Sequence, residues 1–145
     1  MKKSIKAVIF GCLLLIGIVS YAVMIGTPDP DYHTAHDLLV RIAEIEIETG
    51  SLEDYKKILK EEAAASVEKE TGVVAIFPMY QKDSLNKMRI LEIYRNKEAY
   101  EQHVKTPHFL HYKSATATMV KSLRLMDMEP TDIESMHLMF GKMAK

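Results

Sequence analysis

Two neighbouring segments of this chain are apolar on both faces of an extended strand, and this feature constrains the fold most. Residues 73–81 read VVAIFPMYQ, and residues 88–95 read MRILEIYR. Alternate side chains of a strand point to opposite faces, so strands of this kind are buried on both faces. Helices can cover one face, but the chain offers no second sheet for the other. We therefore expect the sheet of a second copy to cover it, which predicts a homodimer.

The segments around these strands predict a regular order of elements within a domain spanning residues 38–129. Strands are expected at 38–48, 73–81, 88–95 and 121–128, and helices at 52–71, 96–103 and from 106 onward, with a turn at 82–86. Gly72 follows the first helix, where a C-terminal cap belongs. The order strand, helix, strand, strand, helix, strand is typical of the ferredoxin-like βαββαβ fold. This is an α+β fold with an antiparallel sheet and helices on one face.

The first 26 residues differ in composition from the rest of the chain. Lys2, Lys3 and Lys6 precede an uncharged apolar run over residues 7–26, which is the pattern of an export signal. Either the segment is cleaved after Ala22, or it stays as a membrane anchor, since about 20 apolar residues span a bilayer. In both cases the remainder leaves the cytoplasm, and the membrane is contacted only through this segment. Residues 27–37 then form a linker.

The C-terminal residues 130–145 predict a short amphipathic helix. Ile133, Met136, Phe140 and Met143 recur at helical spacing. We expect this helix to dock on the domain or on the partner subunit.

Charge and cysteine content exclude several classes of function. The formal net charge is -1, with no cluster of Lys or Arg beyond the first few residues, so nucleic-acid binding is not expected. Cys12 is the only cysteine and lies in the export segment. The folded domain therefore has no thiolate nucleophile, disulfide or cysteine-based metal site.

Polar side chains on the strands suggest a small-molecule pocket at the enclosed face of the sheet. Glu44, Glu92 and Arg124 interrupt otherwise apolar strand faces. Mostly apolar walls with a few polar groups are typical of a pocket for a small molecule. The alternative for each carboxylate is a position at a strand end, in water or paired with an Arg.

Two histidines flank the break between the predicted helices and are candidates for acid–base chemistry. The segment H-V-K-T-P-H-F contains His103 and His108, with Thr106 and Pro107 starting the next helix. A neutral imidazole can act as a general base, whereas the simpler alternative is that both side chains pack and cap at this junction. A metal site of His103, His108 and His111 matches no familiar ligand spacing, so no metal is expected.

These segments together resemble the antibiotic biosynthesis monooxygenase superfamily, in the branch of quinol monooxygenases and related isomerases. The resemblance rests on Arg41-Ile42-Ala43-Glu44-Ile45, on Gly50 before an amphipathic helix, on Glu92-Ile93-Tyr94 and on the run from His103 to Phe109. It implies a dimeric α/β barrel that oxidises phenols or quinols with molecular oxygen, without metal or flavin.

The resemblance also implies roles for individual residues. His103 or His108 would take the phenolic proton, and Tyr94 and Glu92 would orient the ring. Glu44, Tyr112 and Arg124 complete the candidate substrate contacts. The chain contains no Trp, which argues against the haem-degrading relatives. Two alternatives stay open, namely a non-catalytic dimeric module that binds a small molecule and an isomerase of a small sugar-like signal.

Overall fold

The computed structural model describes residues 37–143, which form four strands and four helices. In chain order these are β1 (Leu39–Ile47), α1 (Leu52–Lys69), β2 (Val73–Gln81), β3 (Ser84–Tyr94), α2 (Lys97–His103), α3 (Pro107–Thr116), β4 (Val120–Met128) and α4 (Glu134–Met143). The expected export segment, residues 1–26, and the linker up to residue 36 lie outside the described residues. Among residues 37–143, no helix is long and apolar enough to cross a membrane.

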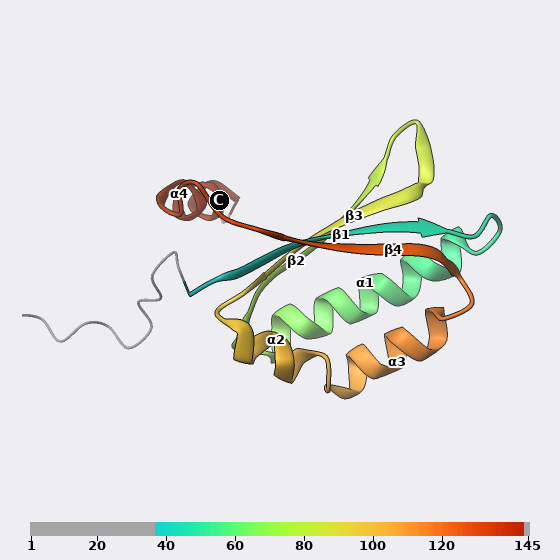
Figure 1. Ribbon diagram of the computed structural model, residues 1–145, viewed down its shortest axis with the longest axis horizontal. Helices are drawn as coiled ribbons and strands as arrows, with labels where there is room; N and C mark the ends of the chain where they lie inside the picture. Colours follow the sequence, from blue (N-terminus) through green and yellow to red (C-terminus); the bar gives the residue numbers. More distant parts are fainter. Residues whose placement is uncertain (1–36, 144–145) are drawn as a thin grey trace, which may run out of the picture.

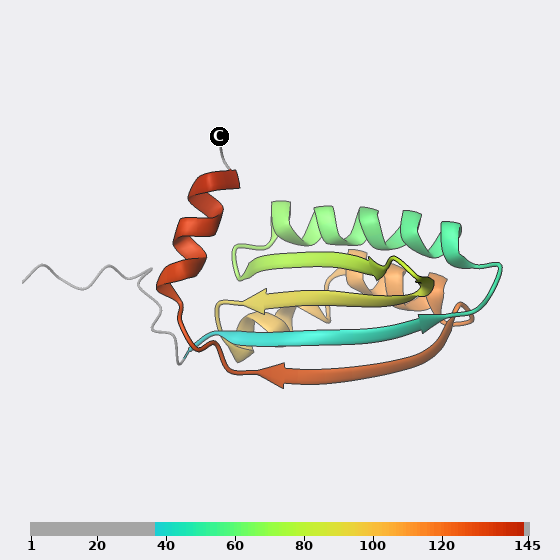
Figure 2. The same cartoon turned by 90° about the horizontal axis from the view of Figure 1, so that it is seen from above.

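The four strands form one antiparallel sheet in the order β2-β3-β1-β4. Helices α1, α2 and α3 lie together on one face of this sheet (Figure 1). Figure 2 looks onto the opposite face, and none of the described helices crosses the strands there. This arrangement confirms the predicted α+β, ferredoxin-like plan.

The hairpin between β2 and β3 is longer than predicted. Strand β3 begins at Ser84, which pairs with Gln81, whereas the sequence indicated a turn over residues 82–86. The polar residues of this segment are compatible with a strand because the hairpin tip is exposed, as the 47% exposure of the Leu85 side chain shows.

Helix α1 ends earlier than predicted, and Gly72 has a different role from a helix cap. The helix stops at Lys69, and Glu70 is its C-cap residue with an extended backbone. Gly72 instead permits α2 to approach the chain closely, since a Cβ atom on Gly72 would lie 2.5 Å from the Cβ of Ala99. A side chain at residue 72 would therefore displace α2 and everything that α2 positions.

The core lies between the sheet and the helices. Its buried members come from β1, β3, α1 and α3: Ala43, Ile45, Ile47, Met88, Ile90, Tyr55, Leu59 and Tyr112. The aromatic rings of α1 and α3 meet there, because the Tyr55 and Tyr112 hydroxyls form a buried hydrogen bond of 2.6 Å.

The sheet register corrects the expectation that Glu44, Glu92 and Arg124 share one enclosed face. Glu92 lies opposite Arg41, on the face of the buried Ala43, whereas Glu44 lies opposite Arg124 on the other face. Alternation shows which residues of one strand share a face, but the relation between strands depends on their pairing.

We call the sheet face without helices the open face. Its apolar residues are Val40, Ile42, Ala75, Phe77, Met79, Leu91, Ile93, Met126 and Met128, which the register places on one side. Phe77 and Met128 are 54% and 49% exposed. The face also carries an ion pair of 2.7 Å between Arg89 and Glu44.

The C-terminal helix forms as predicted, but it does not dock on its own sheet. Helix α4 lies beyond the ends of β1 and β4 and projects from the domain (Figures 1 and 2). Leu138, Met139 and Met143 are largely exposed. Docking of α4 on a partner subunit stays a prediction.

Candidate functional site

A cavity of about 310 Å³ lies between the helix-covered face of the sheet and the helices. Its volume falls within the range of small-molecule sites. Apolar side chains form most of its wall, among them Ala43, Ile45, Leu59, Ile76, Ile90 and Phe109, and its polar groups come chiefly from Arg41, Glu62, Glu92, Tyr94, His103 and Tyr112. The pocket is therefore inside one copy of the chain, not between two sheets as the sequence indicated.

The edge strand β4 supplies one rim of this cavity. Leu123 and Leu125 lie on the helix-covered side of the sheet, opposite Ile45 and Ala43. They line the cavity and are nevertheless 46% and 47% exposed, because the helices do not extend over this edge. Arg41 lies at the same rim, where its Nε donates to Asp127 at 2.7 Å and its guanidinium stacks 4.4 Å from the ring centre of Tyr100.

Glu92 and Tyr94 form one polar group of the cavity. The Tyr94 hydroxyl donates to Glu92 Oε2 at 3.1 Å. Burial raises the pKa of Glu92, partly offset by the Tyr94 hydrogen bond and by Arg41. Burial and the neighbouring Glu92 also raise the pKa of Tyr94. Tyr94 therefore keeps its proton at neutral pH and acts as a hydrogen-bond donor.

Glu62 is a second carboxyl in the cavity, and it is 5% exposed. The Ser66 hydroxyl is 2.7 Å from Glu62 Oε1 and donates to it. Burial raises the pKa of Glu62, while the Ser66 hydrogen bond and His103 oppose the shift. Glu62 was not among the residues predicted from the sequence, although its spacing from Tyr55 and Leu59 places it on the buried stripe of α1.

His103 lies at the end of α2 with both ring nitrogens beside carboxylates. Its Nδ1 is 2.9 Å from Glu70 Oε1, and its Nε2 is 3.6 Å from Glu62 Oε1. The residue is 2% exposed, and its ring packs edge-on against Phe109, with 4.7 Å between ring centres. An ionised carboxylate only accepts hydrogen bonds, so Glu70 places the proton on Nδ1. Nε2 is then the ring nitrogen with the lone pair, and it lies beside Glu62, which lines the cavity together with His103.

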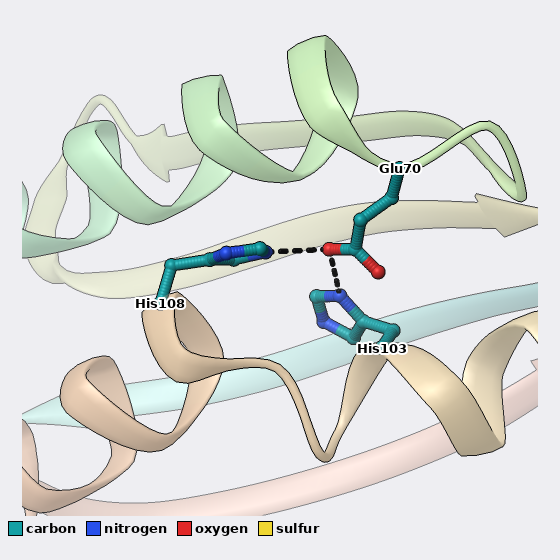
Figure 3. Close-up of side chains that lie close together, drawn as sticks. All are labelled: Glu70, His103 and His108. Atoms are coloured by element: carbon teal, nitrogen blue, oxygen red, sulfur yellow. Dashed lines mark hydrogen bonds and ion pairs between the residues drawn. The ribbon is translucent and has the colours of Figure 1, made fainter.

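His108 contacts the same carboxylate as His103, that of Glu70. Its Nε2 is 2.6 Å from Glu70 Oε1, so both imidazoles converge on one oxygen (Figure 3). The hydroxyl of Thr106 caps the helix that carries His108 by accepting from the amide of Phe109. His108 does not line the cavity. Glu70 was also missed from the sequence, because no spacing rule connects it to residues 33 and 38 positions later.

The remaining predicted residues divide between the cavity and the open face. Tyr112 lines the cavity, and burial raises its pKa to about 12. Glu44 and Arg124 lie on the open face, where Arg124 is 3.7 Å from Glu44. His111 is exposed on α3 and takes no part in the cluster around Glu70.

Comparisons with known proteins agree with this architecture. The sequence model of the family described as antibiotic biosynthesis monooxygenase matches residues 38–115. A solved structure from Bacteroides thetaiotaomicron, assigned to the antibiotic biosynthesis monooxygenases, is 39% identical over 68% of this chain and 94% of its own, with a TM-score of 0.67. No curated protein matches the chain.

Two more solved structures show how far the likeness extends. A protein of Lactobacillus acidophilus assigned as a monooxygenase is 31% identical, over 63% of this chain and 43% of its own, with a TM-score of 0.62. A protein of Pseudomonas aeruginosa is 21% identical over 66% of this chain and 96% of its own, again with a TM-score of 0.62. At that identity the likeness shows the shared fold.

Proposed function

This chain belongs to the antibiotic biosynthesis monooxygenase family, and we propose that it oxidises a phenolic or quinol-type small molecule with molecular oxygen, using His103 as the base. One observation carries the proposal. His103 lines the cavity, its Nδ1 lies 2.9 Å from Glu70 Oε1, and its Nε2 lies near Glu62, another residue of the cavity wall. A base must be oriented as well as present, and the Glu70 carboxylate fixes both the tautomer and the ring plane of His103.

The proposed reaction needs no external reductant. His103 Nε2 takes the hydroxyl proton of the substrate, and the resulting phenolate gives up electrons to oxygen far more readily than the neutral phenol. One oxygen atom is added to the ring and the other leaves as water, so a phenol and one O₂ become a quinone and one water. The substrate supplies all the electrons, and the protein supplies a base and a dry cavity.

The cavity suits an aromatic molecule of one or two rings. An engineered apolar cavity of roughly 150 Å³ holds one benzene, and this cavity measures about 310 Å³ with mainly apolar walls. The Lys and Arg side chains that line the cavity are Arg41, which is paired with Asp127, and Lys113, whereas a sugar phosphate would require a cluster of unpaired cations. The cavity therefore favours an aromatic substrate over the sugar-like substrate of an isomerase.

The proposal includes a homodimer and a location outside the cytoplasm. The exposed apolar side chains of the open face support pairing with a second copy, and the lysines and apolar run of residues 1–26 support export to the cell envelope. A fusion of alkaline phosphatase after residue 37 tests export, because that enzyme is active only outside the cytoplasm. An inactive, stably expressed fusion would contradict export.

The test of function is oxygen uptake by the purified full-length chain with a panel of phenols and hydroquinones. With ¹⁸O₂, mass spectrometry should find one labelled oxygen atom in the product. Removing the base in His103→Ala should lower kcat/KM by about 10²-fold or more. Glu70→Gln should cause a smaller loss, because the amide oxygen can still accept from Nδ1.

The control variant is His111→Ala, which removes an exposed imidazole from α3 and should leave kcat/KM unchanged. Full activity in His103→Ala would eliminate His103 as the base. Thermal stabilisation by these compounds without any oxygen uptake would instead identify a non-catalytic binding module.

A further inference from the structure

We propose that Glu70, His103 and His108 form a binding site for a single Zn²⁺ ion. The three side chains come from the end of α1, the end of α2 and the start of α3. Each offers one ligand atom, and these atoms all lie within 4.8 Å of one another (Figure 3). This inference goes beyond the proposed oxidation, and the binding itself does not depend on it.

The donor set suits zinc better than the hard cations. Two imidazole nitrogens and one carboxylate oxygen are ligands that Zn²⁺ prefers, whereas Mg²⁺ and Ca²⁺ favour oxygen alone. With bonds of about 2.1 Å, neighbouring ligand atoms of a tetrahedral zinc lie about 3.4 Å apart. The distances from Glu70 Oε1 are 2.9 Å to His103 Nδ1 and 2.6 Å to His108 Nε2. A small rotation of the side chains would therefore admit the ion, and water would complete the fourth position.

Solvent can reach the cluster from the side of Glu70 and His108. Their side chains are 14% and 19% exposed, whereas that of His103 is 3% exposed. An ion would therefore enter from outside and meet His103 last, without passing through the apolar cavity.

The surroundings of His103 supply the outer partner that a zinc-bound imidazole requires. Zinc-ligating histidines usually donate their second N–H to a carboxylate or carbonyl. When Nδ1 binds the ion, the proton of His103 moves to Nε2, which lies 3.6 Å from Glu62 Oε1. Glu62 is buried and held by Ser66. The site thus pairs a zinc ligand with a buried carboxylate that is already in place.

The same shift of the proton has a consequence for the proposed reaction. A base at Nε2 needs a free lone pair there, but the zinc-bound tautomer carries a proton on Nε2. Zinc binding would therefore switch off the base. This inhibition depends on the proposed function of His103, whereas zinc binding does not.

The test is titration of the full-length chain with ZnCl₂, after dialysis against a chelator and without a histidine tag. Calorimetry should show one ion per chain in the absence of any organic compound. Co²⁺ in its place should give the visible d–d absorption of a four-coordinate site with nitrogen ligands. His108→Ala and Glu70→Gln should each weaken zinc affinity by about tenfold or more.

His111→Ala is the matched control, because it removes an exposed imidazole from the same helix, and its affinity should equal that of the wild type. Far-UV circular dichroism checks that each variant is folded. Absence of stoichiometric binding to the wild type would overturn the proposal. So would wild-type affinity in folded His108→Ala and Glu70→Gln.

Inhibition of oxygen uptake is a separate measurement. Zn²⁺ should inhibit the wild type, and EDTA should restore the rate. If no substrate is oxidised, the calorimetric result still decides whether the ion binds. Stoichiometric binding without inhibition would show that zinc occupies the site but does not control His103.

Discussion

At the scale of single residues, Glu92 is a carboxyl that folding moves into an apolar cavity. Burial raises its folded-state pKa above the ordinary 4.5, although Tyr94 and Arg41 oppose the shift and Glu62 adds to it. The folded state therefore holds the proton more tightly than the unfolded state. The contribution of protonated Glu92 to the free energy of unfolding is therefore fully present below the pKa of the unfolded state. It is lost as the pH rises through the pKa of the folded state.

We predict that Glu92→Gln removes the part of the pH dependence of the unfolding free energy that comes from Glu92. The unfolding free energy of the wild type should fall relative to that of Glu92→Gln as pH rises above 4.5. Each unit by which the folded pKa exceeds the ordinary value contributes about 1.4 kcal/mol. Urea denaturation at a series of pH values measures the difference, with the exposed Glu61→Gln as a control for the loss of one charge. A constant difference between Glu92→Gln and the wild type at all pH values would contradict the assignment.

At the scale of elements, the position of α2 depends on the backbone at Gly72. The helix approaches so closely that a methyl group at residue 72 would clash with Ala99. Asn96 starts α2 by accepting from the Ala99 amide at 2.8 Å, and His103 ends it. The position of α2 therefore determines whether His103 contacts Glu70 and lines the cavity.

Gly72→Ala should destabilise the protein by about 1–3 kcal/mol, the usual effect of overpacking. Because the clash is with a single methyl group, Ala99→Gly should relieve it. The double variant should be more stable than the sum of the two single changes predicts, by about 1 kcal/mol. Urea denaturation of the wild type, the two single variants and the double variant gives the four unfolding free energies of this double-mutant cycle. Strict additivity would show that Ala99 is not what restricts residue 72.

At the scale of the whole molecule, the open face is the feature that a single copy does not explain. On this face, Phe77 of the edge strand β2 is 54% exposed, and Met79 and Met128 are also accessible. Apolar patches on one sheet face mark interaction sites, and the partner that we propose is a second copy of the chain, which carries the same apolar face. Helix α4, on which Leu138, Met139 and Met143 are largely exposed, projects from the end of the same sheet (Figure 2).

Phe77→Asp should convert the proposed dimer into a monomer, because it places a charge within the buried interface. Leu110→Asp is the matched control, since Leu110 is also 54% exposed but lies on α3. Light scattering coupled to size-exclusion chromatography gives the mass of each variant. A monomeric wild type, or a Phe77→Asp variant that stays dimeric, would refute the interface.

Local patterning was enough to predict the elements, because each depends on neighbours in the sequence. The alternation in β1, the Thr106-Pro107 start of α3 and the apolar runs of β2 and β3 are all visible without coordinates. His103 could be identified as a candidate in the same way, from its place at a helix break. The open apolar face was also predictable, because two strands carry apolar residues on both sides.

Only the tertiary structure decided which of these residues meet. The register placed Glu92 in the cavity and Glu44 on the open face, and the packing of α2 against the end of α1 brought Glu70 to both histidines. The physical reason is that the alternation within one strand shows which of its residues share a face, but not which face of the neighbouring strand they join. Likewise, a residue that follows a helix has no fixed distance to another helix until the two pack. The sequence alone therefore determined the elements and their apolar faces, and the packing between them determined the site.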